Sequence, residues 1–211
     1  MNKHLQEFSI ESKMINEIEK VYFAKIKDFE QLEKARHKET IEQWDMRSKP
    51  SGDQSNMKGN GCVRVRCYDG HRYELTIKNY FGGNKTKINT SHISALEKDI
   101  SIDKEAFEIF RSICPIGFVK TRYTFPVNSN LKFDIDVFHD KEGKLQEWCK
   151  VDVEMKHFTD QIPEWPVDFE EIIDRHTCSE ETGKFVNNLY QEKFNLYNNP
   201  NILPMDDGSH I

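Results

Sequence analysis

The sequence predicts an α+β protein in which eight antiparallel strands close into a barrel, or tunnel, with helices on its flanks. Short runs of alternating polar and apolar residues, bounded by turn residues, are typical of antiparallel strands. Ionisable residues recur at every second position of six of these runs, and the runs differ in the sign of their charges. These observations favour a sheet whose charged face is enclosed.

The expected strands are joined by segments that suit hairpins. Asp69 and Gly70 separate one pair, and a longer loop containing Gly143 separates another. Helical periodicity fits residues 103–112 and 178–196, and residues 28–37 are a charged third candidate. The strands are expected at residues 16–26, 39–47, 61–68, 72–79, 92–100, 118–126, 131–139 and 147–157.

The composition excludes several classes of protein. The chain has 211 residues with 30 Lys and Arg against 36 Asp and Glu, and this net charge of −6 argues against nucleic-acid binding driven by overall charge. Its five cysteines include no C-x-x-C pair, which argues against a disulfide framework and a zinc knuckle. Because no apolar stretch approaches the roughly 20 residues of a spanning helix and no secretory signal is visible, a cytoplasmic protein with no membrane partner is expected.

The chain is expected to form one domain, over residues 16–197. Residues 1–15 form an N-terminal extension and residues 198–211 a C-terminal tail in this prediction. Pro, Gly, Asn and Ser cluster in the tail and again in residues 48–60, which are expected to be a loop between strands.

Each charged stripe lies on one face of its strand, because alternate residues point to the same side. The strands could turn these stripes to water, as half-buried sheets do, or into a closed barrel. Separation by sign favours the barrel, since a solvated face usually mixes both signs along each strand. The cations are Arg64, Arg66, Lys78, Lys120 and Arg122, and the anions are Glu17, Glu19, Asp134, Asp136, Asp152 and Glu154.

An interior with a cationic wall and an acidic wall suits a metal–triphosphate complex. Several Arg and Lys side chains together bind an anion that carries three or more negative charges. Carboxylates repel such an anion but hold Mg²⁺ or Mn²⁺, which bridges to phosphate oxygens. The cations would also neutralise charge on a transferred phosphoryl group while water attacks in line.

Six motifs follow one another in these segments: EIEKVYF at 17–23, EQW at 42–44, RVRCYDGHRYELTIK at 64–78, KTRYTF at 120–125, FDIDVF at 133–138 and VDVEM at 151–155. In this order they resemble the CYTH-domain proteins of the triphosphate tunnel metalloenzyme superfamily. The resemblance implies an eight-stranded antiparallel barrel, dependence on Mg²⁺ or Mn²⁺, and activity on a triphosphate. Inorganic tripolyphosphate, thiamine triphosphate and a nucleoside or RNA 5′-triphosphate are the substrates it implies.

The resemblance also implies roles for individual residues. The metal ligands are Glu17, Glu19, Asp134, Asp136, Asp152 and Glu154. The substrate-binding residues are Arg64, Arg66, Lys78, Lys120, Arg122 and Glu97, and the catalytic residues are Glu17, Glu19, Lys78 and Arg122. One departure bears on catalysis: Val21 stands where the family's E-x-E-x-K signature has a lysine.

Four functions stay open at this point. The leading one is metal-dependent hydrolysis of a triphosphate carried by a small molecule or by an RNA 5′ end. A class IV-type adenylyl cyclase would use the same site to make cyclic AMP from ATP. A tunnel without its signature lysine could instead bind nucleotides or polyphosphate without turnover, and a scaffold with no small ligand is the fourth alternative.

Overall fold

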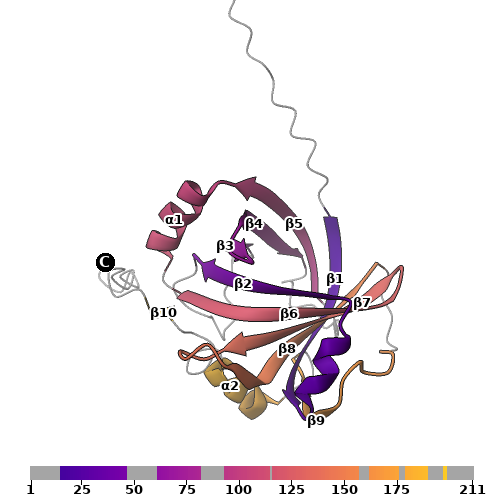
Figure 1. Cartoon of the computed structure of the whole chain (residues 1–211). Helices are drawn as coiled ribbons and strands as arrows, with labels where there is room; N and C mark the ends of the chain where they lie inside the picture. The colour runs from indigo at the N-terminus through magenta and orange to yellow at the C-terminus, as the bar shows by residue number, and fades with distance from the viewer. Residues whose placement is uncertain are drawn as a thin grey trace, which may run out of the picture.

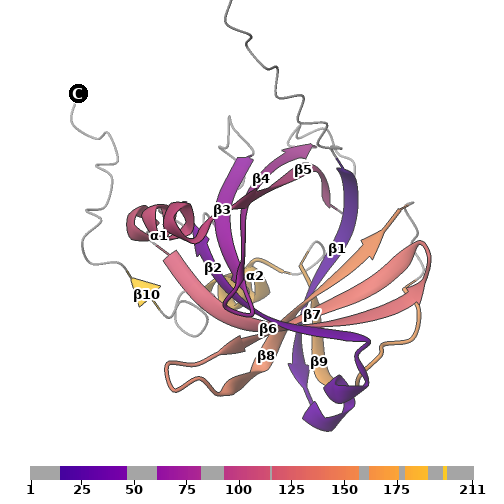
Figure 2. The same cartoon turned by 45° about the horizontal axis from the view of Figure 1, so that its top comes forward.

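The computed structural model describes residues 15–46, 61–81, 93–114, 116–156, 162–175, 179–189 and 197–198. Within these residues, eight long strands curve around a common centre (Figures 1 and 2). They are β1 (Ile15–Ile26), β2 (His37–Asp45), β3 (Gly61–Tyr68), β4 (Arg72–Phe81), β5 (Ile93–Ile102), β6 (Ile116–Asn128), β7 (Leu131–His139) and β8 (Leu145–Met155).

The eight strands form a ring. Their order is β6-β2-β3-β4-β5-β1-β8-β7, and β7 pairs in turn with β6, which joins the two ends of the series. Every pairing in the ring is antiparallel. The predicted fold class is therefore confirmed, and the eight strands agree with the expected segments to within a few residues.

Two short strands and one helix differ from expectation. The sequence analysis missed β9 (Phe169–Asp174), which pairs with β1, and β10 (Tyr197–Asn198), which pairs with β6. The helix expected at 28–37 is wrong: only a 3₁₀ turn, η1 (Phe29–Lys34), forms, because β2 already begins at His37. Residues 1–14 of the expected N-terminal extension, the expected loop at 48–60 and residues 199–211 of the expected tail lie outside the described residues.

Helix α1 (Lys104–Ile113) covers the outer face of the ring at β3 and β4. It begins as predicted, because the carboxylate of Asp103 accepts the backbone N–H of Ala106. Its buried Phe107 packs with Trp44 and Val65 in one apolar cluster. None of the helices in the described part of the chain has the length and apolar character needed to cross a membrane.

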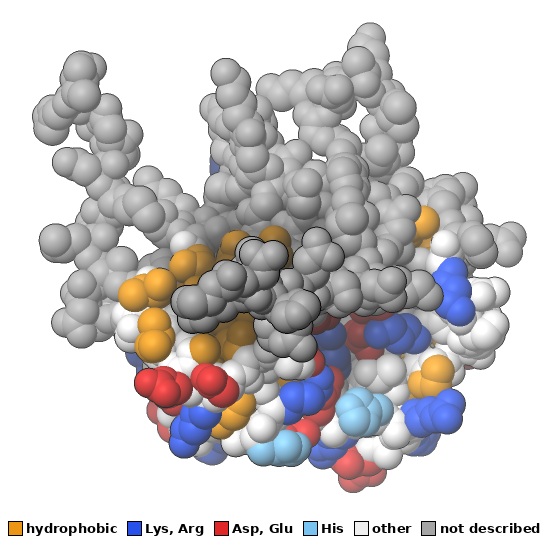
Figure 3. Space-filling view, turned by 90° about the horizontal axis from the view of Figure 1, so that it is seen from above, with side chains coloured by type: hydrophobic (Ala, Val, Ile, Leu, Met, Phe, Trp, Pro, Cys, Tyr) orange, Lys and Arg blue, Asp and Glu red, His pale blue; other side chains and the backbone are white. Residues whose placement is uncertain are grey.

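Contacts between strands that are not neighbours show which face of the ring is the inner one. The Lys78 ammonium on β4 lies 3.4 Å from the Glu19 carboxylate on β1, across β5. Likewise Arg64 on β3 reaches Glu97 on β5 at 3.1 Å. Side chains can meet in this way only on the concave side of a curved sheet, so the charged stripes face inward. On the surface seen in Figure 3, by contrast, basic and acidic side chains are interspersed.

Apolar side chains fill one end of the barrel. Helix α2 (Glu180–Asn188) lies at this end (Figure 1) and contributes Val186, which is followed by the buried Leu189. These two pack with inward-facing residues of four strands, namely Val21, Phe23, Phe118, Phe138 and Trp148. On β6 and β8 the charged residues begin two positions after this apolar layer, and on β7 they end two positions before it, so the layer forms a floor beneath the charged part of the interior.

Candidate functional site

Arg66 is a buried cation held by neutral groups. Its guanidinium is on the inner face of β3, and the residue is 5% exposed. Nε donates to Oε1 of Gln43 at 2.9 Å, and Nη1 donates to the hydroxyl of Tyr68 at 3.3 Å. Among the described residues no carboxylate forms an ion pair with it. Because an uncompensated buried charge is costly, this arrangement favours a bound anion.

Two further cations converge on the carboxylate of Asp136, which is 0% exposed. Arg122 binds it with both arms of its fork, Nε to Oδ1 at 2.7 Å and Nη2 to Oδ2 at 2.8 Å. The ammonium of Lys120 donates to the same Oδ2. Burial alone would raise the pKa of Asp136, but Arg122 and Lys120 outweigh it and hold that pKa well below its usual range.

The pKa of Lys120 is unusually low for a lysine. Burial, together with the charges of Arg122, Arg66 and Lys150, lowers its pKa from 10.5 to about 7, although Asp136 opposes the shift. The three named cations come from β6, β3 and β8, so positive charge is concentrated from several sides of the ring. An anion placed here would favour the protonated amine.

We therefore expect binding of tripolyphosphate at pH 8 to take up a proton at Lys120. In the protein without bound anion the amine of Lys120 is mostly neutral at this pH, and a bound anion would raise its pKa. Calorimetry in buffers of different ionisation enthalpy measures the number of protons taken up on binding. A Lys120→Met variant should lose the proton taken up at Lys120 and keep any proton exchange of tripolyphosphate itself. Equal proton uptake by the wild type and the variant would contradict the assignment.

The lowered pKa of Lys120 also makes the free energy of unfolding depend on pH. Between pH of about 7 and 10.5 the unfolded chain binds a proton at Lys120 that the folded chain does not. The contribution of Lys120 to the free energy of unfolding therefore rises with pH over this interval.

On the opposite side of the ring, Glu97 joins two cations. Its Oε1 lies 3.1 Å from Nη2 of Arg64 and its Oε2 lies 3.1 Å from Nζ of Lys78. Lys78 also contacts Glu19 at 3.4 Å. The structure thus brings the predicted residues of β3, β4, β5 and β1 together, with Glu97 placed to hold the two cations in position. The roles of these residues stay predictions.

A wall of acidic residues alone was expected on β7 and β8, but the structure shows a wall of mixed charge. Two lysines that were not among the predicted site residues lie on the inner faces of these strands. Lys132 contacts Asp134 and Glu154, and Lys150 contacts Asp152. Both were visible in the sequence, because each lies two residues before a selected acid and hence on the same face of its strand. Gln43 and Tyr68 were also missed. Tyr68 lies two residues after Arg66 on the same face of β3, whereas only the pairing of β2 with β3 places Gln43 opposite Arg66.

The donor set on β7 and β8 does not fit a resident metal ion. Asp134, Asp136, Asp152 and Glu154 each contact an ammonium or a guanidinium. Within the described residues, no three His, Cys, Asp or Glu side chains are grouped so as to hold a metal ion. The two remaining predicted ligands are on β1: the backbone of Glu17 lies opposite Ala95, and Glu19 lies opposite Glu154.

Val21 occupies the position of the missing signature lysine. In the pairing of β1 with β8 it lies opposite Asp152, and it is 1% exposed in the apolar floor. The next residue on this face of β1 is Phe23, and the first cation after it, Lys25, pairs with Glu147 and Glu170. An ammonium at this level of the barrel must come from another strand.

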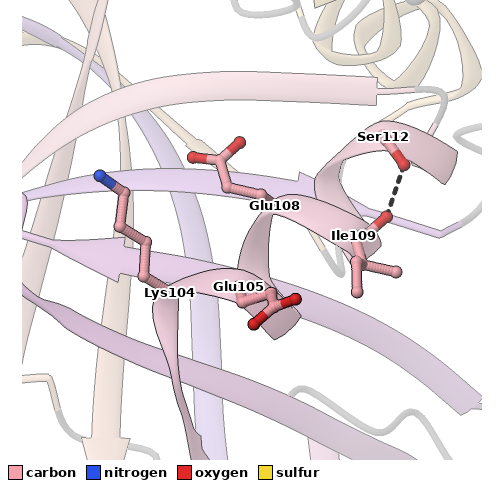
Figure 4. A pocket seen from close by; sticks show the side chains of 5 residues that line it. All are labelled: Lys104, Glu105, Glu108, Ile109 and Ser112. Atoms are coloured by element: carbon pink, nitrogen blue, oxygen red, sulfur yellow. Dashed lines mark hydrogen bonds between the residues drawn. The ribbon is translucent and has the colours of Figure 1, made fainter.

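One hollow of about 590 Å³ lies away from these residues, on the outer surface of α1. Figure 4 shows the helix side chains that line it, among them Ile109, whose carbonyl accepts the hydroxyl of Ser112 at 2.7 Å. It contains none of the predicted site residues.

Solved structures of similar fold include three with described functions or sources. The inorganic triphosphatase NE1496 is 20% identical, with 78% of this chain and 90% of that chain covered at a TM-score of 0.42. HpAC1 from Hippeastrum, described as a putative adenylyl cyclase that reveals a dominant triphosphatase activity, is 13% identical, with 67% of this chain and 80% of that chain covered at a TM-score of 0.46. PH1819 from Pyrococcus horikoshii OT3 is 19% identical, with 85% of this chain and 94% of that chain covered at a TM-score of 0.41.

Each of these likenesses concerns the fold alone. No protein-family profile matches the sequence, and no curated protein does.

Proposed function

We propose that the chain binds the triphosphate group of a small molecule on the inner face of the barrel and hydrolyses it. The observation that carries this proposal is the buried guanidinium of Arg66, which has only neutral partners among the described residues. Two further basic residues, Lys120 and Arg122, share the carboxylate of Asp136, and Arg122 also lies within 4.0 Å of Asp134 and Asp152. A polyphosphate anion would supply the missing negative charge.

In the proposed reaction the cations bind phosphate oxygens and stabilise the charge that develops on the transferred phosphoryl group. Arg64, Arg66, Lys78 and Lys120 hold the chain of phosphates, and Arg122 faces the phosphoryl group that is transferred. Glu19, next to the ammonium of Lys78, accepts a proton from the attacking water. Orthophosphate leaves with the oxygen of that water, and the rest of the substrate leaves as the diphosphate.

The divalent ion belongs to the substrate in this proposal. Mg²⁺ or Mn²⁺ would accompany the triphosphate and neutralise part of its charge. The carboxylates of β1, Glu17 and Glu19, are the predicted ligands that would face it. Inorganic tripolyphosphate is the simplest substrate of this class, and thiamine triphosphate, a nucleoside triphosphate or an RNA 5′ end shares its reactive group.

A binding module without turnover is the second candidate, and the position of Val21 favours it. The resemblance links the signature lysine to catalysis, whereas the residue at this position is apolar and buried. Such a protein would hold nucleotides or polyphosphate through the same cations. It differs from the hydrolase only in releasing no product.

An assay of phosphate release beside binding separates these functions. We expect the wild type with Mg²⁺ or Mn²⁺ to release orthophosphate from tripolyphosphate, and a Glu19→Gln variant to lose roughly 10²-fold or more in kcat, as loss of a general base does. Glu171→Gln, on the exposed face of β9, is the matched control.

Each outcome of this assay has one meaning. Tight binding of tripolyphosphate with no release would assign the binding module, and cyclic AMP formed from ATP would assign the cyclase. Thermal stability that no phosphate compound raises would contradict the whole proposal, because a ligand of the native state must stabilise it by mass action.

A further inference from the structure

The inner faces of β7 and β8 carry basic residues in register with acidic ones. In the pairing of the two strands, Lys132 lies opposite Glu154, and Asp136 lies opposite Lys150. Between these pairs Asp134 lies opposite Asp152. Residues that are directly opposite in an antiparallel pair share a face and have neighbouring side chains. Each carboxylate of this wall therefore has a lysine within reach.

The ammonium of Lys132 bridges two carboxylates. Its Nζ lies 2.8 Å from Oδ2 of Asp134 and 2.8 Å from Oε2 of Glu154. Burial would lower the pKa of Lys132, but Glu154 and Asp134 outweigh it and raise that pKa well above its usual range. A cation that joins carboxylates of two neighbouring strands in this way takes the place that a bridging metal ion would need.

Lys150 contacts the carboxylate of Asp152 on its own strand. Its Nζ donates to both carboxylate oxygens of Asp152, so neither oxygen faces the interior without a cation beside it. With Arg122 on Asp136, each of the four carboxylates of the wall has a cationic side chain beside it. Carboxylates paired in this way attract a divalent ion less strongly than unpaired carboxylates would.

We infer that Lys132 and Lys150 are built-in replacements for a divalent ion on the β7–β8 wall, so that the protein binds a polyphosphate anion without a metal on that wall. The part that concerns the anion rests on the proposed function, and the part that concerns the metal does not. Asp134, Asp136, Asp152 and Glu154 then act as partners of cations, in disagreement with the metal ligands predicted from the sequence.

Binding of Mn²⁺ alone tests the metal part. Wild type and a Lys132→Met/Lys150→Met variant are stripped with EDTA, dialysed and titrated with Mn²⁺, and free Mn²⁺ is measured by electron paramagnetic resonance. We expect the variant to gain one Mn²⁺ site per chain that is about tenfold or more tighter than any site of the wild type. Lys141→Met/Lys144→Met, which removes two exposed lysines of the hairpin between β7 and β8, should behave as the wild type.

A Mn²⁺ site of the same affinity in wild type and variant would overturn the inference. Should the double variant fail to fold, Lys132→Met decides alone, because its side chain is 40% exposed and its loss removes an ammonium from both Asp134 and Glu154. For this variant the expected result is a melting temperature that Mn²⁺ raises more than it raises that of the wild type. Equal shifts would contradict the inference.

Titration with tripolyphosphate in EDTA tests the anion part. We expect its affinity for the wild type in EDTA to stay within about tenfold of the affinity in Mn²⁺. Binding that requires Mn²⁺, and still requires it in a Glu17→Gln/Glu19→Gln variant, would overturn the inference and leave the proposed function standing. Absence of binding under both conditions would instead defeat the proposed function, and the Mn²⁺ titration would still decide the role of the lysines.

Discussion

Replacing Asp136 by Asn should lower the free energy of unfolding by about 3 kcal/mol and make the remaining stability depend on added polyphosphate. The amide keeps the shape of the side chain but leaves Arg122 and Lys120 buried without their shared negative charge. Lys120 can respond by losing its proton, but a guanidinium cannot. Asp134, 3.6 Å from Arg122, limits the loss, which places it at the lower end of the range for broken buried ion pairs.

An anion bound at the site should restore stability to Asp136→Asn more than it stabilises the wild type. At about 100 times its dissociation constant, a ligand of the native state adds roughly 2.7 kcal/mol. Urea unfolding with and without tripolyphosphate measures both effects, with Glu171→Gln as a control for the loss of an exposed acid. A stability equal to that of the wild type in the absence of anion would contradict the described pairing.

Replacing Arg66 by Met should have the opposite pattern, with tripolyphosphate affinity falling roughly 10- to 100-fold and the free energy of unfolding changing by less than about 1 kcal/mol. Charge-assisted hydrogen bonds to phosphate oxygens are lost, whereas the folded protein is relieved of a buried charge. The lost hydrogen bonds to Gln43 and Tyr68 offset part of that relief.

Calorimetric titration and urea unfolding of Arg66→Met measure the two quantities independently. Arg111→Met is the matched control, because Arg111 is an arginine on the outer helix α1 and pairs with Glu42 and Glu108. Its affinity for tripolyphosphate should equal that of the wild type. If Arg66→Met binds tripolyphosphate as the wild type does, Arg66 does not contact the anion.

Together the two variants test how charge is distributed inside the barrel. Asp136 stabilises the fold because it compensates cations, while Arg66 is available to a ligand because no described carboxylate compensates it. A site in which removing an acid costs stability and removing a base costs affinity is one built for an anion.

The alternating stripes were predictable because the twofold repeat of a strand is a local property. Arg64 and Arg66 on one strand, or Asp134 and Asp136 on another, share a face whatever the rest of the chain does. Hairpin turns and the Asp103 cap are local in the same sense, which explains why α1 and most strand ends agree with expectation. The helix expected at 28–37 failed because the start of β2 at His37 allowed only a short turn.

The partners of each charge were not predictable, because they depend on which strands the closed ring places side by side. Lys78 meets Glu19 across an intervening strand, and Glu154 meets Lys132 through the register of β7 with β8. Sequence alone shows that acids and bases line the same surface. Whether a given acid attracts a metal ion or neutralises a lysine depends on distances of a few ångströms between segments far apart in the chain, and Coulomb interactions at such distances decide the chemistry.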